Sequence, residues 1–372
     1  MWSVYLFQVT SGHIGPKLEI SSLRWSLALN DMEDITVEIN KSDLPMVNLK
    51  KWLSPWWAGI VVMWNGTPIV AGPIINRPAE FQDKISLTAA GIRSILARRT
   101  VSHELNNWDG LAESKVSFKG LGLGTIAKYV VEQAQSKAGG RLPITYVMAD
   151  ETAAMDADHE RNYRGFNLQN IDADSVLTKL SNVIDGPDIM FRPKLVADNQ
   201  LTFELWTGTD KQPRIYQKHS LVWDTTAENG EVSDVQIGTT GAYQTFRTYS
   251  IGAGQDEGTL IKVNTNHGPL GDQYPLLETV VKTSDSENPV VVNNHGVANL
   301  FTNKEPLTEV QLTVRGDGVY PFGTFWPGDL VQVVFKGWHG IPDGIIPMRL
   351  LSLSGDISSD VRVSLQPESR FA

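Results

Sequence analysis

Apolar residues change from helical to strand spacing near the middle of this chain. Five of them recur at helical spacing: Val176, Leu177, Leu180, Val183 and Ile184. Asp172 or Asp174 can cap the exposed amides of a first turn, and Gly186-Pro187 then stops the helix. This pattern predicts a helix that begins just after Asp172.

The residues that follow alternate between apolar and polar side chains. Segments 189–192 and 201–206 are strand-like and flank a polar turn at Asp198-Asn199. We therefore predict a helix packed on a β-hairpin, as an α/β element between two flanks that are almost wholly β.

The first hundred residues show strand periodicity. Residues 23–29 and 35–39 alternate across a polar turn, which places one face of each strand in a core. Asn65-Gly66 separates two apolar runs, 60–64 and 69–74, and this dipeptide strongly favours a tight hairpin turn. A short helical piece ends this part of the chain at about Arg99.

The last third is also strand-like, and it resembles the first. Segment 325–365 and segment 55–87 share an order of features: an aromatic-rich corner, an apolar strand, a glycine turn, a Gly-containing Ile-Ile strand and a final alternating strand. Two similar meanders indicate a duplicated small barrel. The alternative is that any two meanders interrupted by glycines look alike.

These patterns predict a mainly β fold with α/β insertions, in the α+β class. We expect an N-terminal β-barrel-like domain over residues 1–100, a mixed α/β domain over 101–250 and a C-terminal β-barrel-like domain with its linker over 251–372. In the middle part, Thr125 is expected to cap a helix that runs to Lys137, and residues 149–162 are expected to form a long loop.

Composition limits the possible functions. The chain has 372 residues, no cysteine and a net charge of −10, from 42 acidic and 32 basic residues. The lack of cysteine excludes disulfide scaffolds and thiolate metal sites, and the few basic clusters are too short for binding based on phosphate contacts. No export signal precedes the first strand, and glycines and prolines interrupt the apolar run 58–75, so no membrane-spanning segment is expected.

Motifs that would carry chemistry are incomplete. His103 and His159 each begin a zinc-protease-like pattern without the second histidine. Segment 120–125 is rich in glycine and opens a helix, but it lacks the spacing of a dinucleotide-binding loop and the lysine of a P-loop. The acidic run around Asp150 is more typical of a solvated loop than of a glycosidase pair. We predict no catalytic, metal-binding or cofactor-binding residue.

Four tryptophans are candidates for contact with a partner. Trp56, Trp57, Trp326 and Trp338 lie at glycine- or proline-containing corners between predicted strands. Each could stack on a sugar or on another protein, and each could equally pack inside a barrel corner.

The order of several short motifs resembles a known family. They are the segment 185–193 with strand 201–206, the glycine-rich turn 251–258, the segment 275–278, and the tail from Trp326-Pro-Gly-Asp to Gln366. Together they are similar to minor tail proteins that form the baseplate or tail-tip hub of long-tailed phages of actinobacteria. The resemblance covers nearly the whole chain.

The resemblance implies a structural virion protein rather than an enzyme. It implies a homotrimeric hub, assembled in the host cytoplasm, that adapts a sixfold tail tube to a threefold tip, because three chains with two similar barrels each present six similar surfaces. Its partners would be the distal tail or tube ring, the tape-measure protein, and tip, fibre or receptor-binding proteins. DNA would pass through without specific binding, repelled by acidic residues.

Two alternatives remain open from the sequence. One is a cell-wall-degrading enzyme built on β modules, and the other is a cell-wall carbohydrate-binding module that uses the tryptophans. A bacterial puncturing machine related to phage tails would share the expected fold.

Overall fold

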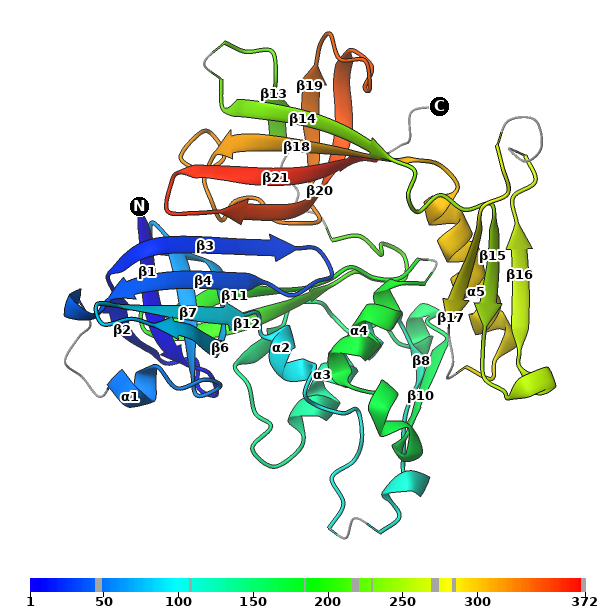
Figure 1. The fold of residues 1–372 in the computed structure, drawn as a ribbon. Helices are drawn as coiled ribbons and strands as arrows, with labels where there is room; N and C mark the ends of the chain where they lie inside the picture. Colours follow the sequence, from blue (N-terminus) through cyan, green and yellow to red (C-terminus); the bar gives the residue numbers. More distant parts are fainter. Residues whose placement is uncertain are drawn as a thin grey trace.

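Strands from both ends of the chain form one continuous sheet in the computed structural model (Figure 1). The structure describes residues 1–43, 49–106, 109–183, 185–215, 221–228, 230–268, 274–282 and 286–368. Within this part the sheet has 13 strands, in the order β14-β18-β21-β20-β3-β4-β7-β6-β5-β1-β2, with β19 paired to β20 and β13 paired to β19.

The strands of this sheet are β1 (Trp2–Gln8), β2 (Ile14–Leu18), β3 (Ile20–Ala28), β4 (Asp34–Asn40), β5 (Ala58–Trp64), β6 (Thr67–Glu80), β7 (Lys84–Ala90), β13 (Leu221–Asp224), β14 (Val232–Thr240), β18 (Leu307–Arg315), β19 (Leu330–Phe335), β20 (Gly344–Gly355) and β21 (Asp360–Pro367). The expected mainly β fold with helical insertions is confirmed, and the strand pairing closes no barrel within the described residues.

The tight turns follow from residues that tolerate a left-handed backbone. Asn30, in the turn between β3 and β4, has φ of 61°. Asn65 and Gly66 have φ of 48° and 84°, which is the geometry of a two-residue hairpin turn between β5 and β6. The hairpins predicted at both positions are confirmed.

The two segments with similar sequence also have similar strand pairing. Segment 55–87 contains β5, β6 and most of β7, which pair in that order as antiparallel neighbours. Segment 325–365 contains β19, β20 and most of β21, which pair in the same way. The likeness read from the sequence therefore extends to the topology of each meander.

Strand β20 links the two ends of the chain. Its first half, from Gly344 to Arg349, pairs with β19, and its second half, from Ser352 to Gly355, pairs with β3. Because β21 lies along its other side, β20 belongs to the C-terminal meander and also extends the N-terminal sheet.

The middle of the chain adds helices and two small sheets. The sheets are β8 (Lys115–Leu121) with β10 (His159–Arg164), and β11 (Ile189–Ala197) with β12 (Gln200–Thr207) and β9 (Ile144–Tyr146). The helices of the middle part are α3 (Leu123–Gln135) and α4 (Ala173–Ser181), whereas α1 (Leu49–Trp52) and α2 (Arg93–Leu96) belong to the first hundred residues. The 3-10 turns among the described residues are η1 (Lys41–Asp43), η2 (Leu111–Glu113), η3 (Ala153–Met155), η4 (Gly165–Asn170) and η5 (Asp256–Gly258).

The predicted helix and hairpin in this region are confirmed. Asp172 caps α4, because its carboxylate accepts a hydrogen bond of 2.8 Å from Ser175 N. The helix ends at Ser181, before Gly186, and Ile184 lies outside the described residues. Strands β11 and β12 then pair as an antiparallel hairpin.

Two local predictions were wrong. Helix α3 begins at Leu123 with Gly122 at its N-cap, so Thr125 lies inside the helix, where its hydroxyl accepts a hydrogen bond of 2.8 Å from Glu151 N. Residues 149–162 are not one loop, because β10 starts at His159 and pairs with β8. Strand β10 was not predicted because its sequence is polar, and in the structure its side chains are exposed at alternate positions.

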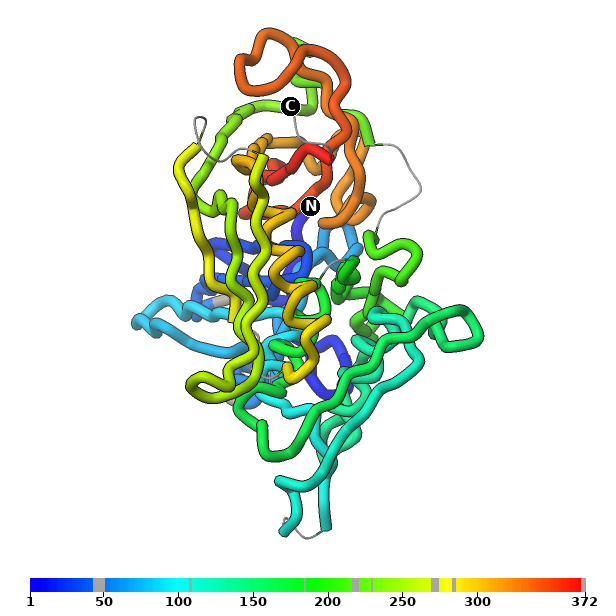
Figure 2. Tube along the Cα trace, turned by 90° about the vertical axis from the view of Figure 1, so that its right-hand side faces the viewer, coloured from blue at the N-terminus to red at the C-terminus, as the bar shows by residue number. Residues whose placement is uncertain are grey.

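A separate module lies at the side of the molecule (Figures 1 and 2). It consists of β15 (Arg247–Ile251), β16 (Ile261–Thr265) and β17 (Glu278–Lys282), with helix α5 (Pro289–Asn303). Strand β15 is central, antiparallel to β16 and parallel to β17. The sequence analysis did not predict α5.

Two clusters of buried side chains hold the chain together. The first contains residues from both ends, including Trp25 of β3 and Leu353 of β20. The second packs α3 and α4 against the β11-β12 hairpin, with Val130, Leu177 and Phe203 among its members. No helix among the described residues is long and apolar enough to cross a membrane.

Candidate functional site

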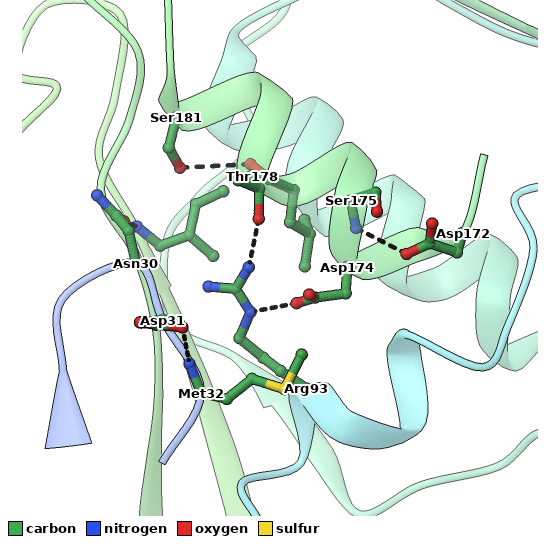
Figure 3. Close-up of polar contacts among 11 residues, drawn as sticks. Asn30, Asp31, Met32, Arg93, Asp172, Asp174, Ser175, Thr178 and Ser181 are labelled. Carbon is green, nitrogen blue, oxygen red and sulfur yellow. Dashed lines mark hydrogen bonds and ion pairs between the residues drawn. The ribbon is translucent and has the colours of Figure 1, made fainter. Parts of the chain in front are cut away.

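Buried charges lie where the N-terminal sheet meets the helices. Arg93 of α2 is only 2% exposed. Its Nε donates to Asp174 Oδ1 at 2.5 Å, and its Nη2 donates to Thr178 Oγ1 at 3.0 Å (Figure 3). Asp174 and Thr178 are four residues apart on α4, so one helix face presents both acceptors to the guanidinium. The contact fixes α4 against the end of the N-terminal sheet.

Glu33 is a buried carboxyl group next to this contact. It is 6% exposed, and Oε2 has no hydrogen-bond partner among the described residues. The pKa of Glu33 is raised to about 7, mainly by burial and also by Asp31 and Asp34, although its own backbone amide and Arg93 oppose the shift. Its carboxylate occupies the space beside Gly91 that a Cβ would need.

A second buried charge joins three distant segments. The Asp188 carboxylate, just before β11, forms an ion pair with Arg349 of β20 and accepts a hydrogen bond of 2.7 Å from Ile215 N. Next to it, Ile189 N donates to Asn30 Oδ1 at 2.6 Å. Burial raises the pKa of Asp188, and Arg349 opposes the shift. Residues from the first, middle and last parts of the chain therefore meet here.

Arg192 lies between two tryptophan rings. Its guanidinium is 4.7 Å from the Trp206 ring centre and 5.3 Å from that of Trp326. Burial lowers the pKa of Arg192 to about 10, and Asp329 and Glu204 oppose the shift. The stack connects the β11-β12 hairpin to the C-terminal strands.

The four predicted tryptophans lie in different environments. Trp326 is 8% exposed and stacks with Arg192, so it offers little surface to a partner. Trp57 is half-buried against Trp52, and Trp56 is half-buried under Arg98. Trp338, in the turn between β19 and β20, is 37% exposed. The structure does not bring the four together.

The residues that the sequence analysis considered for catalysis or binding contact other groups of the protein. The first amide of α3 is bound by a protein group, since Leu123 N donates to Asp210 Oδ1 at 2.9 Å. Asp150 forms an ion pair with Lys128 at 2.8 Å, and His159 Nε2 lies 3.3 Å from Asp210. Within the described residues no group of three or more His, Asp or Glu could hold a metal ion.

The sequence analysis missed the buried charges. A signal existed for Arg192, which interrupts an apolar strand between Phe191 and Pro193. No comparable signal marked Glu33 or Asp188, because each lies next to a turn where an acidic residue is usually solvated.

Known structures share this arrangement of strands and helices. A tail protein from Neisseria meningitidis has a TM-score of 0.58 and 14% identity, over 99% of this chain and 96% of that one. A 43 kDa tail protein of the Shewanella oneidensis prophage MuSo2 has a TM-score of 0.58 and 11% identity, over 99% and 98%. The chain is therefore similar in fold to these two tail proteins.

A third similar structure comes from a secretion machine. It is a type VI secretion component from E. coli, described as structurally similar to the T4 bacteriophage tail proteins gp27 and gp5. Its TM-score is 0.52 at 8% identity, over 99% of this chain and 77% of that one. No protein-family model matches the sequence, and no curated protein is a detectable relative. At these identities the likeness shows the fold alone.

Proposed function

We propose that this chain is a structural component of a phage tail tip or baseplate. The observation that carries the proposal is the likeness to two tail proteins over 99% of this chain and nearly all of theirs. A match over whole chains supports a shared architectural role more strongly than a shared module would. In this role the chain acts by binding other proteins and not as an enzyme.

Within the tail, we place the chain at the hub. Three copies would form a ring, and each would contribute the β5-β6-β7 and β19-β20-β21 meanders as its two similar modules. Such a ring presents six similar surfaces to a sixfold tube and a threefold face to the tip. The matching topology of the two meanders supports this adaptor role.

The proposed partners follow from that position. The ring would contact the distal tail or tube ring on one side and tip, fibre or receptor-binding proteins on the other, with the tape-measure protein and the DNA in its channel. The net charge of −10 supports passage of DNA without binding, because a surface without a basic face releases few counterions.

Labelling of tails tests the tail-tip role. We expect mass spectrometry of purified particles to detect the chain, and antibody labelling to mark the end of the tail distal to the head. Particles without the chain, or label along the whole tube, would contradict the proposal. Class averages of the purified protein test the threefold ring separately, and a particle with a different symmetry would contradict the hub while leaving the tail role intact.

A further inference from the structure

The β15-β16-β17 sheet turns its more apolar face away from the helix that covers it. Helix α5 packs on β15 and β16 and meets small polar residues of β15 there. Thr248 and Ser250 of β15 are fully buried, and Thr248 Oγ1 donates to Asn299 Oδ1 at 3.3 Å. A Cβ on Gly296 would lie 2.2 Å from Ser250 Oγ, so the helix backbone touches this side of the sheet.

The opposite face is apolar and exposed. Strand register sorts its residues into three rows, which are Ile261-Ile251-Lys282, Val263-Tyr249-Val280 and Thr265-Arg247-Glu278. Ile261, Val263 and Val280 are 51%, 53% and 55% exposed. Arg247 and Glu278 form an ion pair of 3.1 Å at one end, so charged residues border an apolar centre.

The arrangement is the reverse of an ordinary amphipathic sheet. A sheet normally buries its apolar face against the rest of the domain and exposes its polar face. Here α5 covers the polar face, and Arg161 and Lys179 of the body of the molecule are close enough to His295 of α5 to lower its pKa in addition to the effect of burial. The apolar face, whose residues Ile261, Val263 and Val280 are about half exposed, is therefore an outer surface, which is typical of a docking site.

The outer face of the three strands is smaller than a stable protein interface. Three strands of five residues each cover about 250 Å², whereas a stable interface buries about 800 Å² per partner. A groove of about 410 Å³ adjoins the face at Glu278 and is lined by Tyr243, Leu276 and Asn303 among others. Tyr243 is 71% exposed and Leu276 46% exposed, so exposed apolar side chains continue past the β17 edge, on the side where Asn303 of α5 lies.

A second outward face on the same chain has matching features. Register in the β13-β19-β20 strands gives the rows Asp224-Val334-Ile345 and Val222-Gln332-Pro347. Ile345 is 62% exposed and Val222 is 40% exposed. This face ends in an acidic residue, Asp224, where the first face ends in Lys282. The exposed Trp338, in the turn that joins β19 to β20, borders the same strands.

From these two faces we infer that the outer face of β15-β16-β17 docks on the outer face of β13-β19-β20 of a second copy. Contact between two different faces can repeat from copy to copy and close a ring. The inference rests on the self-assembly contained in the proposed function, and it names the surfaces that would make it. Lys282 of one copy would face Asp224 of the next.

A substitution in the centre of the β15-β16-β17 outer face tests whether this face is buried between two copies. In the full chain, Val263→Glu places a charge on the apolar row, and we expect light scattering to show loss of trimers. Val196→Glu is the matched control, because Val196 is 59% exposed on the distant β11-β12 hairpin, and it should leave the trimer intact. Circular dichroism and thermal unfolding should show that both variants remain folded.

Charge reversal tests the pairing of the two faces. Lys282→Glu and Asp224→Lys should each weaken association about tenfold or more, because each juxtaposes like charges. The double variant should recover most of that loss. If Val263→Glu breaks the trimer but the double variant is no better than the single ones, the assignment to β13-β19-β20 is wrong.

The remaining outcomes separate the surface from the function. A wild-type trimer that tolerates Val263→Glu and both reversals would overturn the proposed surface and leave the hub intact. A wild-type chain that remains monomeric at high concentration would overturn docking on a second copy. Labelling of tails would still decide whether the chain is a tail protein.

Discussion

Several charged side chains are buried inside this predominantly apolar β fold. Arg93, Asp188 and Arg192 each touch a segment distant in the sequence. A buried ion pair contributes little net stability compared with a well-packed apolar pair, but removing one partner leaves an uncompensated charge and is costly. These residues therefore fix how the segments meet.

The Arg93 contact gives a direct test. We expect Asp174→Ala to lower the free energy of unfolding by about 3 to 5 kcal/mol, because the Arg93 charge stays buried without its acceptor. Denaturant titration measures the change. Asp317→Ala is the control, since its ion pair with Arg315 is exposed and should contribute at most about 1 kcal/mol. Equal losses in the two variants would contradict the structural role of Arg93.

Glu33 predicts a dependence of stability on pH. Its pKa in the folded chain, about 7, is above the ordinary value of 4.5 for a glutamate, so the folded state binds this proton more tightly. The stabilisation is complete below about pH 4.5 and is lost as the pH rises to about 7, by roughly 3 kcal/mol. Glu33→Gln should remove this slope and be the more stable protein at pH 8. Parallel stability curves for the two proteins between pH 4.5 and 8 would contradict the burial of an ionisable Glu33.

At the scale of elements, short-range patterns predicted most of the fold. The alternation of apolar and polar residues predicted β3, β4, β18 and β19, and the Asn65-Gly66 dipeptide predicted the β5-β6 hairpin. Helix α5 was not predicted because Val290 and the valines after it favour strands. Its start is nevertheless marked in the sequence, since Asn288 caps the helix and Pro289 occupies its first turn. The apolar outer face of its sheet was not predicted either, because strands of five residues are too short for an alternation of apolar and polar residues to be recognised.

The β5-β6 turn can be tested by its backbone alone. A Cβ at Gly66 would meet nothing within 4 Å, but φ is 84°. We therefore expect Gly66→Ala to cost about 1 to 2 kcal/mol of unfolding free energy through backbone strain. Gly238→Ala is the matched control, because that position in β14 is equally open and has no such positive φ, and it should gain about 0.5 kcal/mol. A loss at Gly238 as large as that at Gly66 would contradict this explanation.

At the scale of the whole molecule, the sequence indicated two similar meanders but not how they join. The pairing of β20 with β3 brings together residues more than 300 positions apart, and nothing local encodes such a partner. The buried-charge contacts were hidden for the same reason, since Asp188 finds Arg349 only after the chain has folded. Local spacing specifies elements, whereas long-range packing specifies their arrangement.

The joint between β20 and β3 predicts cooperative unfolding. A Cβ at Gly355 would lie 2.7 Å from the Trp25 ring, so Gly355→Leu should force these strands apart and cost about 2 to 3 kcal/mol. Scanning calorimetry should show one transition for the sheet in the wild-type chain and separate transitions for its two halves in the variant. A single transition in the variant, shifted no more than in Gly238→Ala, would contradict the coupling.

The same joint has a consequence during synthesis. Trp25 leaves the ribosome roughly 20 to 60 s before Gly355, at translation rates of 5 to 20 residues per second. Throughout that interval the β3 edge lacks its β20 neighbour, and an unpaired edge strand is a site for aggregation. We therefore expect the nascent chain to need a chaperone or a slow final folding step, and truncated products to be insoluble.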